Sequence, residues 1–256
     1  MSIPPPRPAP GLCLEARRKL SGPVINIEMT LISVLLGVCM FPLMEAATPL
    51  VATLRLAYWP YIATSLLLIM WVWTNVIIHA LTFIGWPVDM VHYLLYILGA
   101  LLIGIQMHFL ADPIAWFGLL IAQLTGILAI YLWDLQLMRR RMSRAAGTEA
   151  TLLAATGRRQ VRGQRLTVSS IVAACISAVL LLLAPATLLA GQLHVVLGLA
   201  WVGWLLIWLA DSIRSFNPLR ELVFLNAAAE LCKEEEDISR VRDEVEQDAG
   251  VHQPRL

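Results

Sequence analysis

The sequence predicts an all-α membrane protein with six transmembrane helices and a C-terminal cytoplasmic helix. Hydrophobic residues make up 59% of the 256 residues, and the mean hydropathy is +0.72. Only 14% of the residues are charged, whereas a soluble globular domain averages about 25%. Because so few charges cannot cover the surface of a soluble fold of this length, we expect the chain to lie in a lipid bilayer.

Six apolar runs have the length that a membrane-spanning helix needs, which is about 20 residues. They are Val24–Glu45, Ala57–Ile84, Val88–Leu110, Ile114–Leu137, Leu166–Leu189 and Gln192–Ile213. Proline and glycine separate most of these runs, as helix ends require. The long interval after the fourth run predicts a 4+2 layout, with four closely connected helices followed by a two-helix hairpin.

This layout divides the chain into five segments. Residues 1–23 form a Pro/Arg-rich arm that we expect to be disordered, and residues 24–137 form the four-helix transmembrane part. Residues 138–165 form a basic cytoplasmic linker, and residues 166–213 form the transmembrane hairpin. Residues 214–256 are predicted to form an amphipathic cytoplasmic tail.

The start of a separate tail helix is predicted at Asn217 and Pro218. Asparagine is a favoured helix cap, and proline suits the first position of a helix. Leucine, isoleucine and valine then recur among glutamates and arginines. This pattern favours a partly ordered amphipathic helix.

Arginine placement predicts the orientation of the chain. The linker contains eight arginines and one acidic residue, Glu149. The arginines are Arg139, Arg140, Arg141, Arg144, Arg158, Arg159, Arg162 and Arg165. The loops on the opposite side carry little basic charge apart from Arg55. By the positive-inside rule, the linker and both termini face the cytoplasm in a multi-pass protein of the cell membrane.

Several tryptophans lie near the predicted helix ends, where aromatic side chains commonly meet the lipid headgroups. They are Trp59, Trp86, Trp116, Trp133 and Trp208. We therefore expect these residues to form an aromatic belt at the two membrane interfaces.

Four polar residues on the second and third runs form the candidate site. Asn75 and His79 lie one helical turn apart on the second run, and Asp89 and His92 share a face of the third. A short turn between the runs predicts that these helices pack side by side. Such a cluster has three alternative interpretations: an interhelical hydrogen-bond network, a proton or ion path, or a metal site.

No motif commits the chain to an enzymatic reaction. The sequence lacks the metalloprotease, nucleophile-elbow, P-loop and dinucleotide-binding signatures. Its net charge of +1 does not favour nucleic acid as a partner, and no cofactor is implied. We expect a small channel or transporter-like bundle. The alternative is a non-transporting scaffold or a subunit of a larger membrane complex.

The expected partners follow from this class of protein. The chain contacts the lipid bilayer, and its basic linker is predicted to contact anionic headgroups, because each arginine near a charged leaflet contributes about 1 kcal/mol of attraction. A second copy of the chain or another membrane protein is a further candidate partner.

Overall fold

The computed structural model describes residues 23–82, 90–190 and 192–251. Its elements are α2 (Pro23–Ala52), η1 (Leu56–Tyr58), α3 (Trp59–Thr82), α4 (Met90–Met107), α5 (Pro113–Met142), α6 (Gly147–Leu183), η2 (Ala186–Ala190) and α7 (His194–Val251). η1 is a 3-10 turn and η2 is a π-helical turn. These residues contain helices and no strand, which confirms the predicted all-α class.

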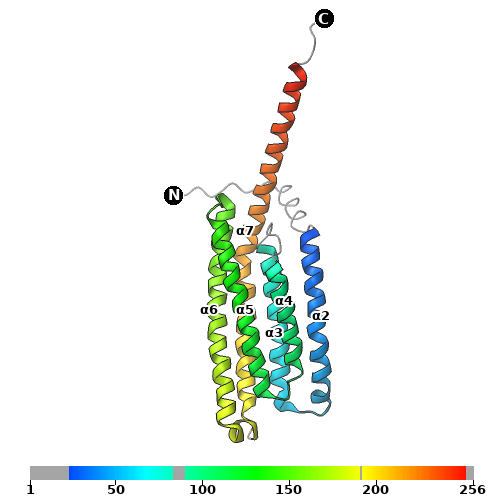
Figure 1. Cartoon of the computed structure of the whole chain (residues 1–256), viewed down its shortest axis with the longest axis vertical. Helices are drawn as coiled ribbons and strands as arrows, with labels where there is room; N and C mark the ends of the chain where they lie inside the picture. Colours follow the sequence, from blue (N-terminus) through cyan, green and yellow to red (C-terminus); the bar gives the residue numbers. More distant parts are fainter. Residues whose placement is uncertain (1–22, 83–89, 191, 252–256) are drawn as a thin grey trace.

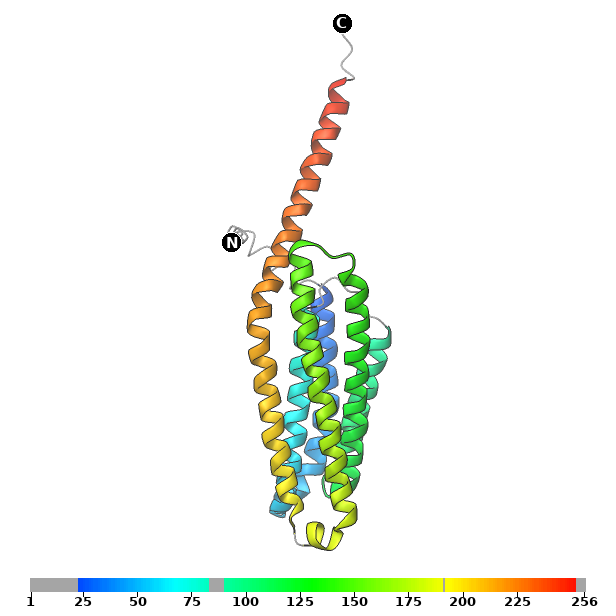
Figure 2. The same cartoon turned by 90° about the vertical axis from the view of Figure 1, so that its left-hand side faces the viewer.

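Successive helices run in opposite directions and form one elongated bundle (Figure 1). The start of α2 and the turn between α5 and α6 lie at one end, which we call the arginine-rich end because Arg139, Arg140 and Arg144 surround that turn. η1 and η2 lie at the opposite end. α7 extends well past the arginine-rich end, as Figure 2 shows.

Four helical segments are long and apolar enough to cross a membrane. They are Leu56–His79, Pro113–Met142, Gly147–Leu183 and His194–Asn226. Two shorter apolar segments, Gly37–Ala52 and Leu94–Met107, overlap the predicted first and third spans, and the first of them continues past the predicted end at Glu45. The fold therefore fits a membrane protein, while the six-span layout stays a prediction.

The basic segment 138–165 is almost entirely helical. It contains the end of α5, a turn at residues 143–146 and the first five turns of α6. Asp112 caps the other end of α5, since its carboxylate accepts hydrogen bonds from the backbone N–H groups of Ile114 and Ala115. The bundle consequently continues through the segment that the sequence predicted as a linker.

The predicted helix start at Asn217 and Pro218 is wrong, because α7 runs unbroken through both residues. Proline inside a helix removes a backbone hydrogen bond and costs about 3 kcal/mol. Tertiary packing offsets this cost: Leu219 and Val223 are buried against Leu152 of α6. The hydrophobic contact therefore holds the helix together across a residue that normally ends one.

The helix neighbours differ from those expected from the short turn at residues 85–87. Among the described residues, α3 packs mainly against α7 and α2, whereas α4 packs mainly against α5 and α2. Gly198 permits a close approach of α7 to α3, since a Cβ atom there would lie 2.7 Å from the Cβ of Pro60. The polar face of α3 is thus directed toward α7 and its neighbours.

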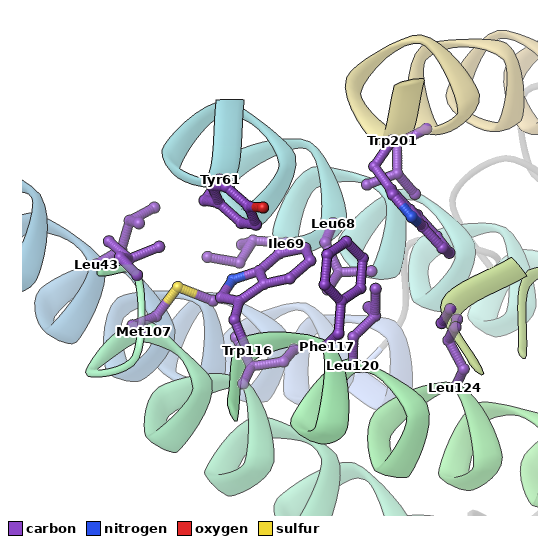
Figure 3. Close-up of a cluster of buried hydrophobic side chains, with 14 of the residues drawn as sticks. Leu43, Tyr61, Leu68, Ile69, Met107, Trp116, Phe117, Leu120, Leu124 and Trp201 are labelled. Carbon is purple, nitrogen blue, oxygen red and sulfur yellow. The ribbon is translucent and has the colours of Figure 1, made fainter. Parts of the chain in front are cut away.

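An aromatic core fills the bundle between α3, α5 and α7. Figure 3 shows the Trp116 ring next to Tyr61 and Phe117, with Trp201 on the facing helix. Tyr61 meets Trp116 edge to face with ring centroids 5.1 Å apart, and Trp116 meets Phe117 in the same way at 5.0 Å. Such edge-to-face contacts contribute about 0.5–1.5 kcal/mol each beyond the buried area.

Indole N–H groups join neighbouring helices through serine hydroxyls. The Trp116 Nε1 donates to Ser65 Oγ at 3.2 Å, and the Trp204 Nε1 donates to Ser170 Oγ at 2.7 Å. Trp116 is fully buried and Trp208 is 3% exposed. The prediction of an aromatic belt is therefore wrong for these two tryptophans, because both face the interior of the bundle.

Candidate functional site

A partly open cavity of about 250 Å³ lies near the arginine-rich end. It is enclosed by side chains from α3, α5, α6 and the middle of α7. The lining residues are Trp71, Asn75, Tyr131, Arg158, Arg159, Arg162, Gly163, Leu166, Trp208, Asp211, Ser212, Ser215 and Pro218. We call it the arginine cavity.

Helical spacing explains why these residues meet. On α6, Arg158, Arg162 and Leu166 are four residues apart and lie on one face. On α7, Trp208, Ser212 and Ser215 are spaced by four and three residues, which also places them on one face. The two faces look toward each other and toward α3.

Arg159 reaches into the cavity and bonds to two other helices. Its Nη2 donates to Asn75 Oδ1 of α3 at 2.7 Å, and its Nε donates to Ser215 Oγ of α7 at 3.2 Å. The Asn75 amide donates in turn to Ser212 Oγ at 3.3 Å and to the Trp71 carbonyl at 2.8 Å. A single guanidinium therefore links α3, α6 and α7.

The charges around the cavity are unbalanced. Arg162 pairs with Asp211 at 2.5 Å. Within the described residues, no carboxylate lies at ion-pair distance from Arg158 or Arg159. The lining therefore has three arginines and a single aspartate, which is a surplus of two positive charges.

The inner wall of the cavity is aromatic. Trp71 and Trp208 lie with their ring centroids 4.6 Å apart and separate the cavity from the aromatic core. Tyr131 forms another wall and approaches α6 closely at Gly163, where a Cβ atom would lie 2.7 Å from the tyrosine Cζ. Glycine at this position makes room for the ring, since any larger residue would displace it.

A second polar group lies beside the cavity, between α3, α5 and α6. The His79 Nδ1 lies 3.4 Å from Asp134 Oδ2, and the Gln160 side-chain amide donates to the same oxygen at 3.1 Å. Asp134 is only 1% exposed. A buried carboxylate needs hydrogen-bond partners, and the Gln160 amide and the His79 ring nitrogen lie within reach of it.

The structure describes the side-chain positions of two of the four predicted site residues. Asn75 lines the arginine cavity and His79 lies against Asp134. His92 belongs to α4, but its side chain is outside the described part, and Asp89 lies outside the described residues. No group of three or more His, Cys, Asp or Glu side chains that could hold a metal ion occurs in that described part.

Sequence reasoning missed the arginines as site residues, because it assigned the whole basic segment to a linker. The signal was present in their spacing. Arg158 and Arg162 are four residues apart, as one face of a helix requires, whereas the position of Arg159 beside Arg158 carries no such signal. Asp134 was not among the predicted site residues, and it faces His79 of α3 and Gln160 of α6.

Comparisons with protein families, with curated proteins and with solved structures find no match to this chain.

Proposed function

We propose that the chain is a six-span membrane protein with its arginine-rich end in the cytoplasm, acting as a small transporter-like bundle. The observation that carries this proposal is the arginine cavity, a polar chamber set among helices of membrane-spanning length. Charged side chains on membrane-spanning helices that face a bundle interior or water commonly mark a substrate path. The alternating helix directions place the start of α2 and the end of α7 on the same side, as an even number of spans requires.

A transporter fits this geometry better than an open channel. The cavity ends at Trp71 and Trp208, and the aromatic core of Tyr61, Trp116 and Phe117 fills the bundle beyond it. A continuously open pore needs a polar passage between both faces, whereas a transporter exposes its site to one side at a time. A cavity that is closed at its inner end is the arrangement expected of one access state.

A non-transporting scaffold or complex subunit is the second candidate. It is favoured by the extension of α5, α6 and α7 past the spans, which has small hydrophobic clusters of its own around Leu152 and Leu153. α7 projects farther still (Figure 2). A membrane partner, or a second copy of the chain, would dock on this extension.

The exposed arginines of the basic segment are proposed to contact anionic lipid headgroups. Arg139, Arg140, Arg144 and Arg165 are exposed, and α6 carries no charged residue from Leu166 to Leu183. The apolar part of α6 therefore begins directly after Arg165. This boundary places the arginines at the level where headgroups lie.

Flux into proteoliposomes distinguishes the two candidates. Vesicles containing the purified full chain are loaded with dyes or tracers for phosphate, chloride, potassium ions and protons. Because the cavity is basic, we expect uptake of an anion above that of protein-free vesicles, and a loss of this uptake in Arg159→Gln. Uptake equal to that of protein-free vesicles for all four ions would remove the transporter proposal and favour the scaffold.

A further inference from the structure

We infer that the arginine cavity binds a phosphate group, presented by an anionic lipid headgroup or by a soluble phosphate ester. The inference rests on the proposed membrane placement, and it names the class of ligand for that site. Three independent features lead to it: the charge of the lining, the geometry of its donors and the position of the cavity along the helices.

The charge of the lining calls for an anion. Arg159 is half-buried, and its hydrogen-bond partners Asn75 and Ser215 are neutral. Withdrawing a guanidinium from water is costly unless an opposite charge compensates it. Asp211 supplies one negative charge, but it already pairs with Arg162. A phosphate carries about −1.5 to −2 charges near neutral pH as a monoester, which matches the two positive charges that remain.

The donors suit a tetrahedral oxyanion. Guanidinium groups offer planar pairs of N–H donors that bind phosphate oxygens in a bidentate way. Arg158 and Arg162 are exposed at the rim of the cavity, and Arg159 projects from within. On the opposite wall the Ser212 hydroxyl adds a neutral donor, whereas the Ser215 hydroxyl donates to the Ser212 carbonyl. Donors from two sides therefore surround one chamber.

The dimensions and position of the cavity restrict the ligand further. A volume of about 250 Å³ accommodates a phosphate and a small substituent, since pockets for drug-sized ligands begin at about 300 Å³. The Trp71 and Trp208 rings provide an apolar wall for that substituent. Leu166 begins the uncharged run of α6, so the cavity lies at the depth of leaflet phosphates and also opens toward water.

The test uses the purified full-length chain in a neutral detergent and measures the midpoint of thermal unfolding. In the first arm, sodium phosphate is titrated against sodium chloride at equal ionic strength. In the second arm, dioctanoyl phosphatidic acid is compared with dioctanoyl phosphatidylcholine. Each arm includes Arg158→Gln and Arg159→Gln, together with Arg55→Gln as the matched control, because Arg55 is exposed and lies beside η1, outside the cavity.

We expect a concentration-dependent rise of the midpoint in at least one arm. A lost charge-assisted contact weakens binding about tenfold or more, so Arg158→Gln and Arg159→Gln should require at least that much more ligand, whereas Arg55→Gln should bind like the wild-type chain. Protection in the phosphate arm assigns a soluble phosphate ester, and protection by phosphatidic acid alone assigns a lipid headgroup. Both results support the inference.

For Asp211→Asn we expect the opposite effect, which is stronger phosphate binding. It removes the only acidic group of the lining and releases Arg162, so it should strengthen binding severalfold. This gain cannot be explained by damage to the fold. Binding that is unchanged or weaker in Asp211→Asn would contradict the inference.

The inference is overturned if neither ligand raises the midpoint of the wild-type chain. It is also overturned if Arg55→Gln weakens binding as much as Arg158→Gln and Arg159→Gln, since that would indicate unspecific attraction to exposed arginines. The proposed membrane placement has a separate readout, the labelling of the two bundle ends in membranes. A failure of phosphate binding with correct labelling would remove the ligand class and leave the bundle in place.

Discussion

Replacing Trp116 by alanine is expected to lower the free energy of unfolding by about 3–5 kcal/mol. The side chain is fully buried, and its ring meets Tyr61 and Phe117 edge to face. Alanine would leave a large void between α3 and α5 and would remove the hydrogen bond from the indole N–H to Ser65 Oγ. Loss of van der Waals contacts dominates this cost, because they hold helices together in a bilayer.

Two variants separate packing from the hydrogen bond. Trp116→Phe keeps an aromatic ring but removes the N–H donor, so it should cost clearly less than Trp116→Ala. Trp59→Ala removes the same atoms at a position that is 43% exposed, and we expect a loss below about 1 kcal/mol there. Reversible unfolding in mixed micelles measures all three values. A similar loss for Trp59→Ala and Trp116→Ala would contradict the packed aromatic core.

Replacing Asp134 by leucine is expected to destabilise the fold by about 1–3 kcal/mol, the cost of leaving a buried hydrogen-bonding group without its partner. Leucine keeps a similar volume but accepts no hydrogen bond. The His79 Nδ1 and the Gln160 amide would both lose their contact with the carboxylate. The Gln160 side chain is buried, so the loss of its acceptor carries the cost of its lost hydration.

A double-mutant cycle with His79→Leu and Asp134→Leu measures the coupling between the two side chains. We expect the double variant to lose less stability than the sum of the single variants, because one interaction is counted twice in that sum. The partly exposed pair Arg141–Glu149 is the comparison, and Glu149→Leu should cost no more than about 1 kcal/mol. Additive losses for His79 and Asp134 would mean that the two residues do not interact.

Much of the architecture was predictable from the hydropathy of the chain and from residue types that begin or end helices. Asp112 and Pro113 indicate the start of α5, and an aspartate cap followed by proline is a strong local signal. α7 shows where local signals fail. Asn217 and Pro218 have the residue types of a helix start, yet contacts with α6 around Leu219 and Val223 override them. Such contacts are formed by residues far apart in the chain and leave no local mark.

The candidate site was less predictable, for a similar reason. The polar face of α3, with Asn75 and His79, followed from helical spacing. Its partners did not, because the sequence does not state which helices are neighbours. The short turn after α3 favoured α4 as the partner, whereas Arg159 of α6 and Asp134 of α5 make the contacts that the structure describes.

The most direct test of the account is the accessibility of the two bundle ends in intact membranes. Single cysteines are introduced at Ser143, in the turn between α5 and α6, and at Thr53, in the exposed loop after α2, in a chain whose native cysteines are replaced. The account predicts that a membrane-impermeant maleimide labels Thr53→Cys in intact cells and labels Ser143→Cys only after the membrane is permeabilised. Labelling of Ser143→Cys from outside intact cells, or equal labelling of both positions, would contradict a bundle that spans the membrane with its arginine-rich end in the cytoplasm.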